Sequence, residues 1–477
     1  MTKRTEIVAP TLAIARLTIR VAVRSKLVGS MAALLVVLIV ALPLSVHGDG
    51  SLVSEVRMVV KYTLWAATGP LSAVTLWASC GAVAGEIESR RIRLAAVKPV
   101  SRVTFLLGKW LAIGALNALA LILVGAIVLI TVYGKQRPRR WSAEDRRDLR
   151  ESVLTARTRY VPPQPDVRAE VERRFRLIVQ RSGSLPAGMS ECDVMTLLER
   201  RILSELSVVM PGRERTYVFR IREESIEREP TVRLRYRLTP SYSETGKAAA
   251  TWFVGTRSRP EQHSVSVDSF RYGQRTVSLP MPVATDGDNE VVVTFRNGGE
   301  DASTAAFFYG ANSIELLVGA GGFVPNLTRA LAVLWCMLAT LAALGLTAGT
   351  FFSFPVAAFL ATAVMSVTMA SGFFAYSSER HQGCGHDHGH AQHGEEASRG
   401  VWRGALRLVL SAGRSTLERA DAVLRPARGI DPIGRVSDGV RIGWKDVGRA
   451  LLWLGIVYPA VLALPGWGCL RRRELAA

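Results

Sequence analysis

The sequence lacks the motif with which most ATP-hydrolysing proteins hold their nucleotide. Gly108, Gly134 and Gly246 each precede a lysine, but Trp, Gln and Ala follow those lysines, and no phosphate loop of the form GxxxxGK followed by Ser or Thr occurs. The apolar runs also contain no row of Asp, Glu or His, which a proton-coupled pump needs. Nucleotide binding by the usual route and secondary transport are therefore both disfavoured.

Cysteine is scarce as well. The 477 residues contain five, Cys80, Cys192, Cys336, Cys384 and Cys469, and their spacing indicates no disulfide framework. Three of the five lie in or at the ends of apolar runs, where cysteine serves as a small hydrophobic residue. A bond between Cys192 and Cys384 is conceivable, because both are expected on the same side of a membrane, but nothing in the spacing supports it.

Apolar residues and positive charge are abundant. Hydrophobic residues make up 49% of the chain and gather in long runs, which is typical of a membrane protein. The formal net charge is +20. Such a charge favours contact with anionic lipid and retention of basic segments in the cytoplasm. Nucleic-acid binding is disfavoured, because neither a recognition motif nor a separate basic domain occurs.

Six apolar runs can cross a bilayer as helices, which takes roughly 20 residues each. They are residues 27–45, 60–84, 105–132, 324–346, 355–376 and 450–467. The N-terminal flank, the segment between the second and third runs, and the C-terminal tail each carry more Arg and Lys than acid, which places all three in the cytoplasm. The sequence therefore predicts an α-helical polytopic protein of the inner (cytoplasmic) cell membrane, with six transmembrane helices and both termini cytoplasmic.

Residues 1–26 predict a cytoplasmic amphipathic helix along the membrane surface, because apolar and basic residues alternate there at near-helical spacing. The alternative is that they are only the first turns of the first span. A cleavable signal peptide is disfavoured, since the apolar stretch is too long and no small-residue cleavage site follows. Residues 27–133 would then hold the first three transmembrane helices, and residues 447–477 the sixth with the cytoplasmic tail.

Residues 134–323 form a polar insertion, which the six-span topology places outside the membrane. Its first part, 140–210, has helical spacing, and Ser142 followed by Asp145 and Ser190 followed by Asp193 are plausible helix starts. Its second part, 214–318, contains eight short alternating runs separated by turn residues. We therefore expect an inserted extracytoplasmic α+β domain containing a β-sandwich. Aromatic residues such as Trp252 and Phe308 fit a sandwich core, and a groove for carbohydrate or peptide is the alternative.

Residues 324–376 would hold transmembrane helices four and five, and residues 377–446 an extracytoplasmic loop with amphipathic helices. That loop opens with a His-rich run, which contains His381, Cys384, His386, His388, His390 and His393. Imidazole and thiolate bind zinc, copper or nickel, so weak and flexible metal binding is one interpretation. The other is an adventitious binder without a role. The run also supports a broader hypothesis, that the chain is a metal-handling membrane protein.

The cytoplasmic segment 85–109 is too charged to be only a turn. It contains Glu86, Glu88, Arg90, Arg91, Arg93, Lys98, Arg102 and Lys109. Its centre predicts a short helix with arginines on one side and Leu94 on the other, which Pro99 would end. Because Glu86 and Glu88 diverge at i and i+2 on a helix, they are disfavoured as an acid–base pair. Anchoring to lipid headgroups is the alternative to docking on a partner.

Within this segment the stretch GEIESRRIRLAAVKPVSRVTFLLGKWLA resembles permease subunits of type-2 ABC transporters. The shared features are an acidic pair, a short helix, a Lys-Pro-Val-Ser-Arg run and a Gly-Lys-Trp entry into the next span. The similarity extends more weakly to the N-terminal helix and to the last residues of the chain, about a third of it in all, and it does not cover the insertion. It implies contact with an ATP-binding subunit through Glu86, Glu88, Arg90, Arg91, Arg93, Leu94, Lys98, Pro99 and Arg102.

The resemblance implies the membrane-spanning permease subunit of an ATP-driven exporter. Such a subunit is not itself an enzyme, and it pairs with a second copy or a paralogue and with cytoplasmic ATP-binding subunits. No cofactor is expected in this chain beyond weak zinc, copper or nickel at the His-rich run, and no nucleic acid. An envelope protein or glycan is a further partner expected at the outer domain. The alternative is a membrane-anchored extracytoplasmic binding or assembly protein without transport activity.

Overall fold

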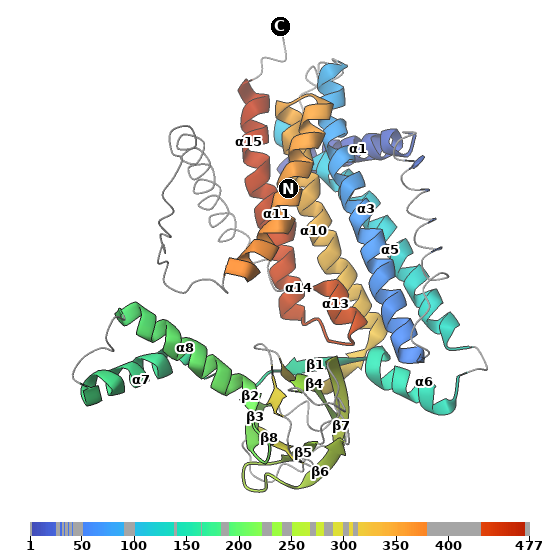
Figure 1. The fold of residues 1–477 in the computed structure, drawn as a ribbon. Coiled ribbons are helices and arrows are strands. Elements are labelled where there is room, and N and C mark those ends of the chain that lie inside the picture. The colour runs from blue at the N-terminus through green and yellow to red at the C-terminus, as the bar shows by residue number, and fades with distance from the viewer. Residues whose placement is uncertain are drawn as a thin grey trace, which may run out of the picture. The chain divides into compact units, whose positions relative to one another are not determined.

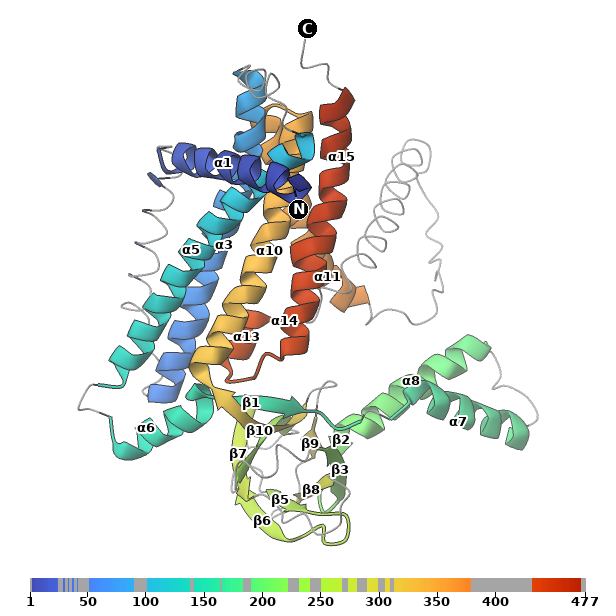
Figure 2. The ribbon, with the colours of Figure 1, turned by 180° about the vertical axis from the view of Figure 1, so that it is seen from behind.

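The computed structural model of the chain describes residues 2–24, 29–30, 33, 37, 41, 51–89, 101–137, 141–163, 165–182, 190–221, 231–240, 250–267, 273–280, 290–298, 305–308, 313–378 and 431–472. These residues fall into two compact units. The first is built from the described parts of Met1–Thr155, Gly322–Glu379 and Gln392–Ala477, and the second from those of Ala156–Gly321. The first unit is helical, and the second combines β-sheets with two helices (Figures 1 and 2).

The first unit is a bundle of long helices with a surface helix across one end (Figures 1 and 2). Its long members are α3 (Leu52–Glu88), α5 (Arg102–Lys135), α10 (Phe323–Phe351), α11 (Phe354–Ser378) and α15 (Tyr458–Arg472), and α1 (Thr2–Arg24) lies against α5. Shorter elements are α6 (Ala143–Leu149), α13 (Pro432–Ser437), α14 (Trp444–Ala450) and the π-helical η1 (Arg150–Leu154) and η3 (Leu451–Val457). The central helix is α10, because it packs on α3, α5, α11 and α15.

Three helices in the described part of the chain are long and apolar enough to cross a membrane. They are Arg102–Lys135, Phe323–Phe351 and Trp444–Arg471, the last of which combines α14, η3 and most of α15. These three match the third, fourth and sixth expected spans. The helices α3 and α11 run through the second and fifth, and most of the first lies outside the described residues. The structure therefore supports a membrane-associated protein, and the count of six spans stays a prediction.

Several hydroxyl side chains form hydrogen bonds inside the bundle. In α3, Ser72 Oγ donates to the carbonyl of Thr68, and Thr75 Oγ1 to the carbonyl of Leu71, both at 2.7 Å. Thr75 also hydrogen-bonds Asn117 Oδ1 of α5 at 2.9 Å. Bonds to the preceding turn and to a neighbouring helix suit an environment from which water is absent. They join α3 to α5 near the middle of both helices.

Glycines bring α10 against the backbone of α3. A Cβ at Gly345 would overlap Ser79 Oγ and lie 2.7 Å from the carbonyl of Leu76. A Cβ at Gly349 would lie 2.6 Å from the carbonyl of Cys80. The two glycines are four residues apart, which is the small-residue spacing that membrane helices use for close contact. The α3–α10 contact therefore depends on the absence of side chains at these two positions.

Two threonines of α10 hold the last helix. The backbone becomes π-helical at η3, just before Pro459, which has no N–H to donate. Thr340 Oγ1 donates to the carbonyl of Leu454 at 2.6 Å, and Thr347 Oγ1 to that of Leu462 at 2.7 Å. These bonds satisfy carbonyls near the irregular turn, as membrane helices with proline require.

Short segments close the end of the bundle opposite α1 (Figure 2). Trp141 and Leu149, in and beside α6, and Ile433 of α13 are buried in the core shared by α3, α5 and α10. The boundary between the units therefore falls after Thr155, although the composition already changes near residue 134. A few apolar residues are enough to seat a short polar helix such as α6 on the bundle.

Asn326 of α10 forms hydrogen bonds with the backbone of the segment that precedes α14. Its Nδ2 donates to the carbonyl of Val440 at 2.9 Å, and its Oδ1 accepts from the N–H of Ile442 at 2.8 Å. Because the amide is buried and bonded on both sides, it can replace the water that these backbone groups would otherwise need. The described end of the 377–446 loop is therefore packed on the bundle.

The second unit contains two sheets. The six-stranded sheet has the order β1–β10–β4–β9–β2, with β7 also on β4, and the four-stranded sheet has the order β3–β8–β5–β6. The strands are β1 (Thr155–Tyr160), β2 (Val208–Val209), β3 (Glu214–Arg220), β4 (Thr231–Pro240), β5 (Ala250–Gly255), β6 (His263–Val267), β7 (Gly273–Pro280), β8 (Glu290–Asn297), β9 (Ala306–Phe307) and β10 (Ile314–Gly322). Strands β3 to β10 coincide with the eight alternating runs of the sequence.

The two sheets share one core, in the arrangement of a β-sandwich. Tyr236 of β4, in one sheet, lies 5.0 Å from Trp252 of β5, in the other, measured between ring centroids. Phe295 of β8 lies 4.7 Å from the same tryptophan, and Phe308 packs edge-on against Phe295 at 5.0 Å. These aromatic residues are buried. They serve the core, as the sequence predicted for Trp252 and Phe308.

Two helices, α7 (Val167–Ser182) and α8 (Glu191–Ser207), pack against each other in this unit. The helix α8 begins with a capping box of Ser190 and Asp193, as predicted from the sequence. Near its start, Cys192 is disulfide-bonded. Cys384, the partner considered above, lies outside the described residues, and Cys80, Cys336 and Cys469 are free thiols.

Replacing Gly349 with leucine should destabilise the helical unit, because the new side chain would meet the backbone of Cys80. Overpacking of this kind costs about 1–3 kcal/mol or more. Thermal unfolding of the detergent-solubilised chain would measure the loss. Gly134→Leu is the matched control, since nothing lies within 4 Å of a Cβ there. An equal loss in both variants would contradict the close α3–α10 contact.

Candidate functional site

The candidate site is the junction where α3 ends and α5 begins, on either side of residues 90–100, which lie outside the described residues. The helix α3 ends at Glu88, and the N–H of Ser89 donates back to the carbonyl of Gly85. On the other side, Ser101 caps α5, because its Oγ accepts from the N–H of Thr104 at 3.1 Å. Both ends of the segment are therefore held in defined helix caps.

A buried ion pair joins the two helices at this junction. Lys109 of α5 is 1% exposed, and its Nζ donates to Glu86 Oε1 of α3 at 2.6 Å. The same ammonium donates to the carbonyl of Ala82 at 2.7 Å and lies 4.8 Å from the ring centroid of Phe105. A buried charge needs a counter-charge and further hydrogen bonds, and Lys109 has both. Lys109 is thus an internal residue, although the sequence groups it with a charged tip.

The second carboxylate contacts a different helix. Glu88 Oε1 accepts from the N–H of Phe354 at the start of α11, at 3.1 Å. A carboxylate at a helix N-terminus satisfies a free N–H group and is attracted by the helix dipole. Glu86 and Glu88 therefore diverge, as expected from their spacing, and bond α5 and α11 respectively. Their expected contact with a partner stays a prediction.

The helix α1 is docked on α5 beside the ion pair. A Cβ at Gly108 would lie 2.9 Å from Ile14 Cβ and 3.0 Å from the carbonyl of Thr11. Thr11 and Ala15 on the same face are buried. The opposite face carries the exposed Arg16, Arg20 and Arg24, which are spaced at i, i+4 and i+8. This is the amphipathic helix predicted for the N-terminus, and its basic side faces away from α5.

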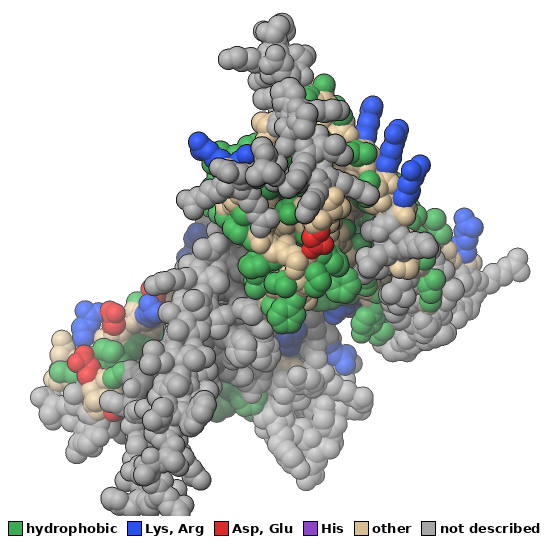
Figure 3. All heavy atoms as spheres, turned by 90° about the horizontal axis from the view of Figure 1, so that it is seen from above, with side chains coloured by type: hydrophobic (Ala, Val, Ile, Leu, Met, Phe, Trp, Pro, Cys, Tyr) green, Lys and Arg blue, Asp and Glu red, His purple; other side chains and the backbone are tan. Residues whose placement is uncertain are grey.

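Of the remaining predicted docking residues, only Arg102 lies within the described part of the chain. Arg102 is half-buried in the first turn of α5. Arg90, Arg91, Arg93, Leu94, Lys98 and Pro99 lie outside the described residues. Figure 3, which looks onto this end of the helical unit, shows Lys and Arg side chains around a largely hydrophobic surface. Such a surface suits the boundary between a membrane and water.

Sequence reasoning missed a second ion pair at the opposite ends of the same helices. Lys135 near the end of α5 pairs with Glu55 near the start of α3. The two glutamates are 31 residues apart and the two lysines 26, which in helices is about 46 Å and 39 Å at 1.5 Å per residue. Both distances exceed a hydrocarbon core of about 30 Å. The sequence contained a signal for this arrangement. Glutamates lie at the two ends of α3, and lysines lie near the two ends of α5.

The predicted metal site is not tested by the structure. His381, Cys384, His386, His388, His390 and His393 all lie outside the described residues. Within the described ranges no group of three or more His, Cys, Asp or Glu side chains could hold a metal ion. Metal binding at the His-rich run therefore stays a prediction.

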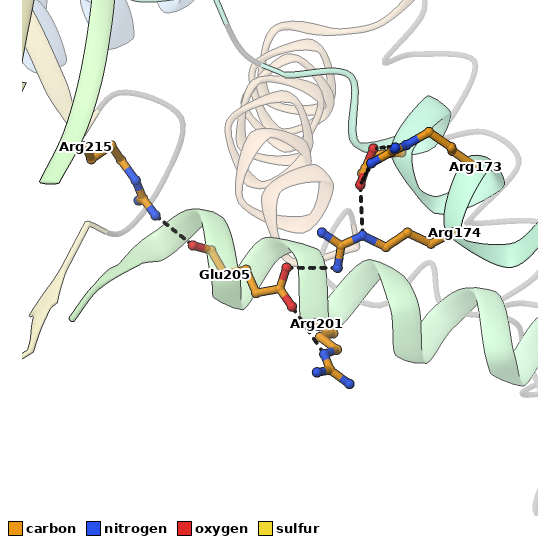
Figure 4. Close-up of polar contacts among 6 residues, drawn as sticks. Arg173, Arg174, Arg201, Glu205 and Arg215 are labelled. Atoms are coloured by element: carbon orange, nitrogen blue, oxygen red, sulfur yellow. Dashed lines mark hydrogen bonds and ion pairs between the residues drawn. The ribbon is translucent and has the colours of Figure 1, made fainter. Parts of the chain in front are cut away.

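A pocket of about 450 Å³, whose lining includes charged side chains, lies beside the helices α7 and α8 in the second unit. Glu170 of α7 pairs with Arg173 and Arg174 at 2.7 and 2.8 Å, and Arg174 continues to Glu205 of α8 at 2.8 Å. Arg215 of β3 donates to the carbonyl of Glu205 at 2.7 Å (Figure 4). The network therefore links α7, the end of α8 and the sandwich.

This network is unsuited to acid–base catalysis. Hydrogen bonds from Arg173, and then from Arg174, lower the pKa of Glu170 to about 2. The hydrogen bond from Arg174 likewise lowers the pKa of Glu205. A general acid or base needs a pKa near the working pH, and these carboxylates are shifted away from it. The charges serve structure, and the pocket is a weak candidate for chemistry.

Glu86→Gln should strongly destabilise the helical unit, because the charge of Lys109 would stay buried without its counter-charge. Breaking a buried pair in this way costs about 3–5 kcal/mol. The double variant Glu86→Leu with Lys109→Met should recover most of the loss, since an apolar pair of similar size removes both buried charges. Denaturant unfolding would compare them. Arg147→Gln, which breaks the exposed pair with Glu151, is the control and should cost less than about 1 kcal/mol.

The α7–α8 network should weaken in acid. The folded-state pKa of Glu170 is about 2, below the ordinary 4.5, so its stabilisation is full above pH 4.5 and is lost as the pH falls toward 2. Protection factors from hydrogen exchange in α7 and α8, which correct for the pH dependence of the intrinsic exchange rate, should fall between pH 6 and pH 2. Glu170→Gln should have lower protection factors at pH 6, and they should depend less on pH. The same pH dependence in both proteins would rule out this contribution.

No family model, no curated protein and no solved structure matches this chain. The resemblance of segment 85–109 to ABC permeases therefore stays an expectation. What the chain does has to be argued from the contacts of the junction and from the composition of the helices.

Proposed function

We propose that the chain is the membrane-spanning permease subunit of an ATP-driven exporter. It would couple ATP hydrolysis by a separate subunit to export or to work on the cell envelope, as a dimer with a second copy or a paralogue. The observation that carries the proposal is that the end of α3, which leads into segment 90–100, is bonded to two neighbouring helices. Glu86 bonds α5, and Glu88 bonds α11.

These bonds suit the transmission of a displacement. A partner seated on segment 90–100 would push on the end of α3 and the start of α5 together, because Glu86 and Lys109 hold them side by side. The same push would reach α11 through Glu88 and Phe354. The sequence has no phosphate loop of its own, so the ATP would be bound by the partner. The residues expected to seat the partner are the arginines at 90, 91 and 93 and Leu94.

The six-span topology belongs to this proposal. The exposed basic row of α1, the Arg-rich segment 90–100 and Arg471 near the C-terminus favour a cytoplasmic side for one end of the bundle. The insertion follows three spans, and this odd number places it on the side opposite the N-terminus. The disulfide at Cys192 agrees, because disulfides persist in oxidising compartments outside the cytoplasm. The proposed location is the cell membrane, with both termini cytoplasmic.

The alternative function is a membrane-anchored binding or assembly protein, and one observation favours it. The helices α7 and α8 expose several large apolar side chains, including Leu177, Leu197 and Leu203. Exposed apolar residues on a helical pair are typical of protein–protein contacts. In that case the outer domain would be the active part and the helices an anchor. The two functions differ in whether an ATP-binding subunit binds segment 90–100.

Copurification tests the proposal. The partner to use is a P-loop ATPase encoded beside this chain, coexpressed with the full-length permease. Leu94→Asp should lower its recovery about tenfold, because a polar group in an apolar seat costs on the order of 1–3 kcal/mol. The paired reversal Arg91→Glu and Arg93→Glu should act in the same direction. Membrane insertion should be unchanged.

Arg150→Glu is the matched control, because Arg150 is exposed and lies outside the segment; it should leave recovery of the ATPase at the wild-type level. Equal recovery with wild type and Leu94→Asp would refute docking at the segment and favour the alternative function.

A further inference from the structure

A long apolar groove lies between α5, α10 and α15, with a volume of about 550 Å³. Its walls include Val103 and Leu107 of α5, Leu346 of α10, and Leu464 and Trp467 of α15. Its lining contains no charged side chain. The hydroxyl of Thr347, its most polar group, already donates to the carbonyl of Leu462. A ligand of this groove would therefore have to be a hydrocarbon.

The size and the lining of the groove limit what can occupy it. Small residues form much of its lining, among them Ala343, Gly455 and Ala463, while Leu464 and Ile456 stand out as large exposed side chains. A helix with its side chains is about 10–12 Å across and packs best on a shallow surface. A pocket of this volume falls in the range of small-ligand sites, about 300–1,000 Å³. A single extended acyl chain fits this volume better than a helix of a second copy.

One end of the groove is positively charged. Arg102 directly precedes Val103 of the wall, at the start of α5. Arg471 follows Trp467 by one turn of α15, and its guanidinium lies 5.6 Å from the centroid of that indole ring. Among the described residues neither arginine forms an ion pair. Both lie at the end of the bundle that contains the Lys109–Glu86 pair, since Leu470 packs beside Leu106 there.

We propose that this groove binds an anionic phospholipid. One acyl chain would lie between α5 and α15, and the phosphate would be held at Arg102 and Arg471. Guanidinium groups favour phosphate oxygens, and a tryptophan at the boundary is typical of the level where headgroups begin. Charge complementarity selects an anionic over a zwitterionic lipid. The inference requires only that α5, α10 and α15 lie in a membrane, and it is independent of the proposed export function.

Native mass spectrometry of the delipidated full-length chain, with phosphatidylglycerol or phosphatidylcholine added back, would test it. Wild type should retain phosphatidylglycerol in preference. Ala460→Phe, which adds a ring to the groove lining, should lower that retention about tenfold. Val461→Phe is the matched control, because Val461 is exposed and does not line the groove, and it should bind as wild type. Arg102→Gln with Arg471→Gln should abolish the preference for the anionic lipid.

A second measurement does not depend on the folding of any variant. Phosphatidylglycerol with a photoactivatable group on its acyl chain should label α5 and α15 of the wild-type chain at residues of the groove. Labelling spread evenly over all exposed helix faces would overturn the proposal. So would equal retention of lipid by Ala460→Phe and Val461→Phe. Loss of a dimer in Ala460→Phe, with lipid retention unchanged, would show that a second copy occupies the groove instead.

Discussion

The helical unit depends on the buried ammonium of Lys109. Burying a lysine costs several kcal/mol unless a carboxylate and further acceptors surround it, and Glu86 with the carbonyl of Ala82 provides them. Because those acceptors belong to α3 and the lysine to α5, the pairing fixes the register of one helix against the other. The cap at Ser101 and the α1 contact at Gly108 are then placed within about two turns of the same lysine.

Further contacts along α3 hold the helices α5 and α10 in place. The Glu55–Lys135 pair fixes the far ends of α3 and α5, and the Thr75–Asn117 contact joins their middles. Gly345 and Gly349 of α10 pack closely against the backbone of α3. Polar contacts and small residues hold membrane helices together, since apolar side chains gain little by leaving lipid for each other. Helices α3, α5 and α10 therefore form a frame that should move as one body.

The sequence predicted strands and helix caps that depend on neighbouring residues. It did not predict contacts between residues far apart in the chain. Strands β3 to β10 follow from alternating residues between turns, and the caps at Ser142 and Ser190 from their neighbours three residues on. Strand β1 has the sequence TARTRY, in which apolar and polar residues do not alternate. One of its buried positions holds Arg157, so an apolar pattern could not reveal this strand. The Glu86–Lys109 pair joins residues 23 apart on antiparallel helices, and only their packing sets which charges meet.

The contacts of the two neighbouring glutamates differ in strength, and the difference indicates which helix can move. The Glu86–Lys109 pair is largely buried, so breaking it costs about 3–5 kcal/mol. The bond from the N–H of Phe354 to Glu88 is exposed, and a charge at a helix terminus contributes only about 0.3–1 kcal/mol. A force applied at segment 90–100 would therefore leave α3 and α5 together and release α11 first. In the proposed transport cycle, α11 is the element expected to shift against the frame.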